Sequence, residues 1–101
     1  MPRYFLELQY NGTNYNGWQI QHNATGVQQK LNEALSVYLA QNVETLGCGR
    51  TDTGVHALQF YAHFDSHNAV ENFDAFCYHV NCILPRDINL LQMHAVNPDA
   101  N

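Results

Sequence analysis

Hydrophobic and polar residues alternate over the first segment of the chain, from Arg3 to Tyr10. The apolar side of this alternation consists of Tyr4, Leu6, Leu8 and Tyr10. A period of two that is sustained over this length predicts a β-strand with one buried face. Asn11-Gly12 follows directly, and this dipeptide is a turn signal.

The pattern changes to a helical period farther along the chain. Apolar positions recur at intervals of three and four along one stripe, formed by Val27, Leu31, Ala34, Leu35, Tyr38 and Leu39. This spacing predicts an amphipathic helix that runs to about Ala40. Thr25 and Gln28 have the spacing of a capping box, so Thr25 is expected to be the N-cap residue.

Four more elements are expected in the rest of the chain. A short β-prone run spans 43–48, and alternation over 58–64 predicts a third strand. Residues 66–68 offer helix-start chemistry, and apolar residues at helical spacing then continue to Leu84-Pro85. The segment from Ile88 to Val96 predicts the last strand, which a polar tail follows.

The expected order of elements is β-α-β-β-α-β, which predicts an α+β protein of the ferredoxin-like class. In this class two βαβ units form an antiparallel sheet with both helices on one face. The other face would be uncovered in a lone domain. Phe5 would lie there beside Tyr61 and His63, so we expect something to pack or bind on this face.

Composition and charge argue against several classes of protein, among them membrane-spanning, secreted and non-specific nucleic-acid-binding proteins. The 101 residues suffice for one domain or for part of a larger protein. Four Lys+Arg and nine Asp+Glu give a formal net charge of −5, which argues against a free-standing, non-specific nucleic-acid binder. No apolar run approaches the ~18 residues of a membrane span, and no secretory signal is expected. Three irregularly spaced Cys fit a reducing cytosol.

Two segments combine residues that can carry chemistry. The loop after the first strand contains Tyr15 and Trp18, which either close the edge of the core or line a site. The segment 48–57 places Arg50 two residues before Asp52, between glycines. A guanidinium keeps a neighbouring carboxylate ionised, and such a carboxylate can act as a nucleophile in a dry cleft. A structural ion pair in a tight turn is the alternative interpretation.

The sequence of residues 49–57, Gly-Arg-Thr-Asp-Thr-Gly-Val-His-Ala, resembles the signature of the TruA family of tRNA pseudouridine synthases. Three further blocks are similar to segments of the same family, in the same order and at compatible spacing. These blocks are residues 10–19, 27–35 and 81–88. Together the four blocks cover nearly all of the chain.

The resemblance implies an isomerase that converts uridine to pseudouridine at positions 38–40 in the anticodon stem-loop of tRNA, without a metal or organic cofactor. Asp52 would be the nucleophile, and Arg50 would pair with it and assist in flipping the target base. Whether the carboxylate adds to C1′, adds to C6 of the base or promotes a glycal intermediate stays open. Further substrate-site candidates are Thr51, His56, Tyr15 and Trp18, of which Thr51 and His56 would shape the loop.

The resemblance also implies partners. Members of the family carry a second, larger half of similar fold, bind tRNA between the two halves and work as homodimers. The second half would supply much of the basic surface and a tyrosine that stacks on the target base. Residues 1–101 are therefore expected to be a single N-terminal catalytic-half domain of a cytoplasmic enzyme, truncated before the second domain and inactive alone.

Two other functions fit the same fold class, because this architecture hosts many functions. One is a non-catalytic RNA-binding or protein-interaction module, and the other is a small dimeric metabolic or regulatory domain. An enzyme should present Asp52 and Arg50 together at the open edge of the sheet, whereas a binding module needs basic or aromatic residues spread over the sheet face. Cys77-x-His79-x-x-Cys82 does not predict a metal site, since its side chains would not share one helix face, and Cys77 is expected in the core.

Overall fold

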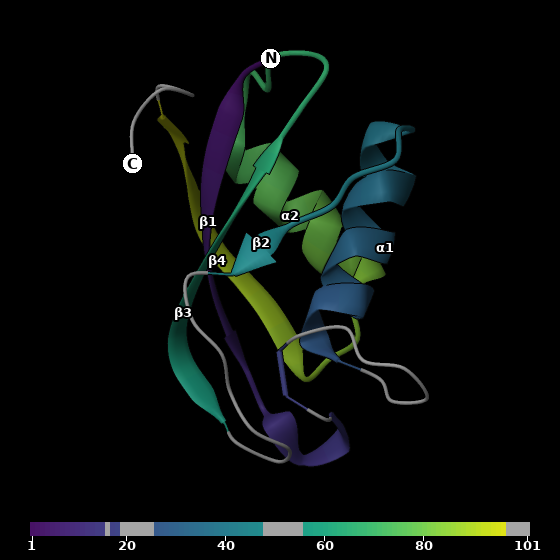
Figure 1. Ribbon diagram of the computed structural model, residues 1–101, viewed down its shortest axis with the longest axis vertical. Coiled ribbons are helices and arrows are strands. Elements are labelled where there is room, and N and C mark those ends of the chain that lie inside the picture. The colour runs from purple at the N-terminus through teal and green to yellow at the C-terminus, as the bar shows by residue number, and fades with distance from the viewer. Residues whose placement is uncertain (16, 19–25, 48–55, 97–101) are drawn as a thin grey trace.

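The computed structural model describes residues 1–15, 17–18, 26–47 and 56–96, with the backbone alone at residues 57 and 58. These residues form an antiparallel sheet of four strands in the order β2-β3-β1-β4, together with two helices (Figure 1). The elements are β1 (Arg3–Tyr10), the 3-10 turn η1 (Gly12–Asn14), α1 (Val27–Leu39), β2 (Leu46–Gly47), β3 (Ala57–Asp65), α2 (Phe73–Ile83) and β4 (Ile88–Val96). The predicted ferredoxin-like α+β class is therefore confirmed.

β1 lies in the middle of the sheet because both of its edges are paired. Its last residue, Tyr10, lies opposite Ala57 at the start of β3 and opposite Ile88 at the start of β4. The apolar side predicted from the alternation is buried, and it consists of Tyr4, Leu6, Leu8 and Tyr10. The end of β1 therefore meets the beginnings of both neighbouring strands at one end of the sheet.

Both helices lie on the same side of the sheet (Figure 1). The predicted stripe of α1 is buried at Val27, Leu31, Ala34 and Leu35.

The predicted cap of α1 is wrong by one residue. The N-cap is Gly26, and no side chain caps it, whereas Thr25 was expected there. The first helical N–H groups bond to carbonyls of the loop before the helix: Val27 to Gly17 at 3.1 Å, and Gln28 to Trp18 at 2.8 Å. A tertiary contact therefore satisfies the helix start, where backbone N–H groups have no partner inside the helix.

α2 begins several residues later than the predicted start at 66–68. Ser66 is buried, and its hydroxyl donates to the carbonyl of Asn68 at 2.6 Å, which holds a turn. The N-cap of the helix is Asn72, whose side chain accepts a hydrogen bond from the N–H of Ala75 at 3.0 Å. Ser and Asn favour both turns and caps, so the sequence contains two possible starts and the fold uses the second.

The strand predicted over 43–48 is also shorter than expected, because β2 has only two residues. Val43 and Thr45 are buried, but their N–H groups bond to side chains of α1 instead of a neighbouring strand. Val43 donates to Ser36 Oγ at 3.0 Å, and Thr45 donates to Asn32 Oδ1 at 2.9 Å. Residue 48 lies outside the described residues.

Neither helix covers the other face of the sheet, as predicted (Figure 1). Phe5 stacks on His63 across the β1–β3 pair with ring centroids 5.3 Å apart, and Tyr61 is exposed. A register shift between β1 and β4 after Glu7 coincides with two successive exposed residues, Leu91 and Gln92. In the part of the chain that is described, no helix has the length and apolar character to cross a bilayer.

Candidate functional site

The segment that carries the signature lies between β2 and β3. Arg50, Thr51 and Asp52 belong to residues 48–55, which lie outside the described residues, as does the expected pairing of Arg50 with Asp52. The flanking residues are described: Gly47 ends β2, and His56 directly precedes β3. The described part of the site therefore consists of these two flanks and the elements that hold them.

His56 ties the C-terminal flank to the loop after β1. Its ring is exposed, and Nδ1 accepts a hydrogen bond from the backbone N–H of Gly12 at 2.9 Å. A nitrogen that accepts carries no proton, so the neutral ring in this arrangement has its proton on Nε2. His56 therefore anchors the start of β3 to the turn that follows β1.

Trp18 packs against the N-terminal flank. Its indole is only 2% exposed and lies against Phe60 of β3, with ring centroids 4.7 Å apart. It also covers Gly47 so closely that a Cβ atom there would lie 2.3 Å from Nε1 of the indole. Glycine fits at this position because it has no side chain. Both flanks of segment 48–55 thus contact the loop between β1 and α1.

Asp87 fastens the same loop to the start of β4. The Tyr15 hydroxyl donates to Oδ1 of Asp87, and the Asn14 amide donates to Oδ2 at 3.3 Å. The N–H of Asn11 donates to the backbone carbonyl of Asp87 at 2.9 Å. Burial, the hydrogen bond to Asp87 and the negative charge of that carboxylate raise the pKa of Tyr15 well above its ordinary value. The hydroxyl therefore stays protonated and remains a donor at neutral pH.

α1 fixes the residues that lead into β2. Asn32 Oδ1 accepts hydrogen bonds from the N–H and the hydroxyl of Thr45, at 2.9 and 2.7 Å. The side-chain amide of Gln28 donates to the carbonyl of Thr45. Thr45 is fully buried, and these bonds satisfy each of its polar groups. Because Gly47 follows two residues later, α1 also sets the point from which segment 48–55 departs.

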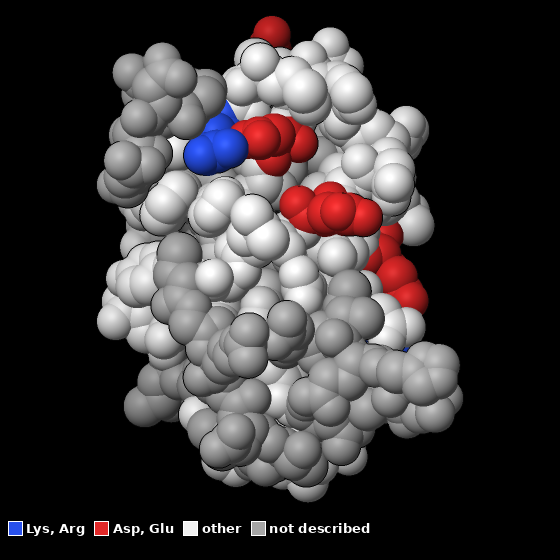
Figure 2. All heavy atoms as spheres, in the orientation of Figure 1, with Lys and Arg blue, Asp and Glu red and all other residues white. Residues whose placement is uncertain are grey.

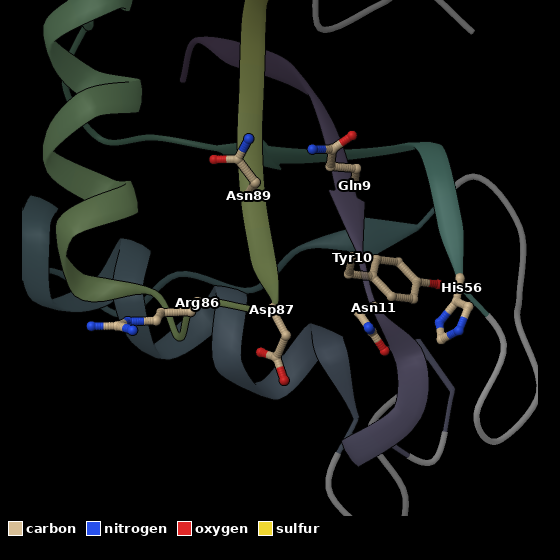
Figure 3. A pocket seen from close by; sticks show the side chains of 7 residues that line it. All are labelled: Gln9, Tyr10, Asn11, His56, Arg86, Asp87 and Asn89. Atoms are coloured by element: carbon tan, nitrogen blue, oxygen red, sulfur yellow. The ribbon is translucent and has the colours of Figure 1, made fainter.

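Antiparallel pairing brings these contacts to one end of the sheet. Asn11 at the end of β1, His56 before β3 and Asp87 before β4 lie around an open pocket of about 370 Å³ (Figure 3). The other residues that line the pocket are Gln9, Tyr10, Arg86 and Asn89. The Arg86 side chain points away from His56 in this view. The pocket presents amide, imidazole and carboxylate groups, which can hydrogen-bond a polar ligand.

The sequence assigned no role to three residues that hold these elements together, Asn32, Asn81 and Asp87. Asn81 and Asp87 are matched positions of block 81–88 in the family resemblance, whereas Asn32 occupies an unmatched position within block 27–35. Asn81 fastens α2 to β4, since its side chain donates to the Leu90 carbonyl at 2.8 Å and accepts from the Leu90 N–H at 2.7 Å. The hydrogen bonds by which Asn32, Asn81 and Asp87 connect neighbouring elements are evident only from the structure.

Cys77 lies in the core, as predicted. Burial and the nearby charge of Asp74 raise the pKa of its thiol, so the thiolate form that binds metals is disfavoured. Cys82 is exposed. Within residues 1–15, 17–18, 26–47 and 56–96, no three His, Cys, Asp or Glu side chains are grouped so that they could hold a metal ion.

The described surface seen in Figure 2 is not basic. Among the described residues on this face, acidic side chains extend over a wider area than Lys and Arg do, and most of the other described residues are uncharged. The chain also has a net charge of −5. Binding of a polyanion such as RNA depends on basic groups that neutralise phosphates, and the described part of this face offers few of them.

No protein-family model matches the chain. Curated proteins named tRNA pseudouridine synthase A do match it over its whole length. The identity is 48% over 101 residues with the protein of Bacteroides thetaiotaomicron, 43% over 101 residues with that of Bacteroides fragilis, and 44% over 102 residues with that of Porphyromonas gingivalis. Each alignment covers 100% of this chain but only 37–40% of the relative. The resemblance found from the four sequence blocks is thereby confirmed for the N-terminal part of those relatives.

Proposed function

We propose that the chain forms the catalytic half of a tRNA pseudouridine synthase, because its whole length is similar to the N-terminal part of longer proteins of that name. The complete enzyme would act on uridines at positions 38–40 in the anticodon stem-loop. The observation that carries this proposal is the alignment of the whole chain, at 43–48% identity, with proteins of that name. The signature at 49–57 lies inside the aligned region.

The proposed reaction is an isomerisation, so no cofactor has to supply or remove electrons. The N1–C1′ bond of uridine breaks, the uracil turns, a C5–C1′ bond forms, and the proton lost at C5 is balanced by the proton gained at N1. Asp52 acts as the nucleophile, and Arg50 keeps its carboxylate ionised. Arg50 also assists in swinging the base out of the stem-loop, which costs a few kcal/mol of unstacking.

Apart from Asp52 and Arg50, the candidate residues would hold the catalytic segment in place, and the contacts of His56, Trp18 and Tyr15 favour this role. His56 is the C-terminal flank of segment 48–55 and accepts a hydrogen bond from Gly12, while Trp18 packs on the N-terminal flank, Gly47. Tyr15 lies in the same loop as Gly12 and Trp18 and bonds to Asp87 before β4. Thr51 shapes the segment itself. A nucleophile whose surroundings are held in place reacts faster, because little motion has to be restricted when the substrate binds.

The proposal includes partners outside this chain. A net charge of −5 repels tRNA, so binding would depend on a second, larger half that follows in the complete protein. That half would supply basic surface and a tyrosine that stacks on the target base. The complete enzyme would work as a cytoplasmic homodimer, and the 101-residue piece alone would be inactive.

The experiment uses the protein made from the complete open reading frame, incubated with unmodified tRNA. Pseudouridine mapped at positions 38–40 is expected from the unchanged protein and not from Asp52→Ala. Asp65→Ala is the matched control, since Asp65 is an exposed carboxylate that pairs with Arg3. Folded, tRNA-binding protein that forms no pseudouridine would favour the non-catalytic module instead. Product from residues 1–101 alone would contradict the inactivity of the piece.

A further inference from the structure

We propose that Asp87 is a positioning residue for Gly47 and His56, the two flanks of the segment that carries Asp52. It acts on these flanks through Tyr15, Gly12 and Trp18. This inference rests on the proposed function, because it adds a requirement for the same reaction. It concerns a carboxylate outside the signature, on the far side of the central strand β1 from β3.

Asp87 is suited to this role because its own position is fixed. The chain turns directly before β4, where the Ile88 N–H donates to the Pro85 carbonyl at 3.1 Å, and the Ile88 side chain is buried in the core. The carboxylate then accepts hydrogen bonds from two neutral donors, the Tyr15 hydroxyl and the Asn14 amide. Hydrogen bonds to an ionised acceptor are roughly twice as strong as bonds between neutral groups. Asp87 is therefore a firm attachment point for the loop.

The attachment at Tyr15 is connected to both flanks of segment 48–55. The Tyr15 N–H donates to the Gly12 carbonyl at 3.0 Å, and the Gly12 N–H donates to His56 at the C-terminal flank. Trp18 follows in the same loop and covers Gly47 at the N-terminal flank. Releasing Tyr15 from Asp87 is therefore expected to disturb the contacts at both flanks together.

A direct role of Asp87 in RNA binding would give the opposite result. A carboxylate repels phosphates, so a neutral replacement in direct contact with RNA would tighten tRNA binding. A positioning role predicts a slower chemical step at unchanged tRNA affinity. Misplacement of a reacting group by about 1 Å can lower a rate by as much as 10²-fold, so a loss of about 10- to 100-fold is expected.

The test compares Asp87→Ala, Asp87→Asn and Tyr15→Phe in the complete protein, in single turnovers with enzyme in saturating excess over tRNA. Asp87→Ala and Tyr15→Phe should each slow pseudouridine formation without changing the Kd for tRNA. Their double variant should be no slower than the slower single variant, because both remove one shared bond. Asp87→Asn keeps an oxygen that can accept from the Tyr15 hydroxyl, so it should recover part of the rate.

The matched control is Asp65→Ala, which removes a carboxylate at the opposite end of β1 and should leave the rate unchanged. A readout that does not depend on activity is the fluorine resonance of Trp18 in protein labelled with 5-fluorotryptophan, assigned with Trp18→Phe. This resonance should shift in Asp87→Ala and Tyr15→Phe but not in the control.

Wild-type rates in Asp87→Ala and Tyr15→Phe would overturn the inference. A changed tRNA affinity with an unshifted Trp18 resonance would also overturn it. If Asp87→Ala does not fold, the rate and the Trp18 resonance of Tyr15→Phe test the inference instead. This variant keeps the buried ring and removes only the hydroxyl. If the unchanged protein forms no pseudouridine, the proposed function fails, and the positioning inference, which rests on it, is overturned with it. If the unchanged protein is active and Asp52→Ala is inactive, the proposed function holds. The Asp87 and Tyr15 variants then test the positioning role alone.

Discussion

Replacing Gly47 by Ala is expected to destabilise the contact between β2 and the loop before α1. A Cβ atom on residue 47 would lie 2.3 Å from Nε1, 2.8 Å from Cε2 and 2.9 Å from Cδ1 of Trp18. The indole has little room to retreat, because it is 2% exposed and packs on Phe60 with ring centroids 4.7 Å apart. Overpacking of a filled core costs about 1–3 kcal/mol, and three close contacts to one rigid ring favour the upper part of this range.

Urea unfolding of the protein measures this loss as a decrease in the free energy of unfolding at unchanged m. Leu46→Ala is the control on the same strand, because Leu46 is 61% exposed and its truncation should change stability by less than about 0.5 kcal/mol.

A double-mutant cycle tests whether the loss arises at the predicted contact. Trp18→Phe removes the five-membered ring that lies nearest residue 47, so in that background Gly47→Ala should cost less by about 1 kcal/mol. A Gly47→Ala protein as stable as the unchanged one would refute the packing argument. A loss of equal size in the Trp18→Phe background would place its cause elsewhere.

Two further expectations concern Tyr15 and Asn81. The raised pKa of Tyr15 means that its protonated hydroxyl contributes stability below the ordinary value of 10.0 and loses that contribution as pH rises above it, so the free energy of unfolding should fall more steeply there in the unchanged protein than in Tyr15→Phe. Parallel pH curves would contradict this. Asn81→Ala removes both hydrogen bonds to the Leu90 backbone and should cost about 1–3 kcal/mol in urea unfolding. Asn42→Ala, at an exposed position after α1, should cost less than about 0.5 kcal/mol, and equal losses would count against the reasoning.

The strands and the stripe of α1 could be predicted because their signals are local and periodic. β1 and β4 have the predicted bounds, since alternation marks β1, while Leu84-Pro85 and a polar tail bracket β4. The start of α2 and the length of β2 were wrong because contacts decide them. Ser66 turns the chain before α2, while Val43 and Thr45 bond to side chains of α1. Residues suited to more than one local structure take the one that the neighbouring elements favour.

The chemistry of the candidate site stays a prediction from residue identity, whereas the contacts around it could not be predicted from the sequence. Residues 49–57 carry the family signature in one short run. The groups that hold its flanks are far apart in sequence: Tyr15 and Asp87 are separated by 72 positions, and Gly12 and His56 by 44. No period or short motif relates positions at such distances. Only the pairing of β1 with both β3 and β4 brings them together.

The central place of β1 also determines when residues 1–96 can complete their sheet during synthesis. β1 is made first, but its partners are β3 and β4, and β4 is the last strand of the order. At about 5–20 residues per second, the ribosome needs roughly 4–17 s to proceed from the end of β1 to the end of β4. During this interval the apolar side chains of β1 lack a complete sheet to pack in, and such nascent segments are prone to aggregate. The residues at the centre of the finished sheet therefore wait longest for their last packing partner.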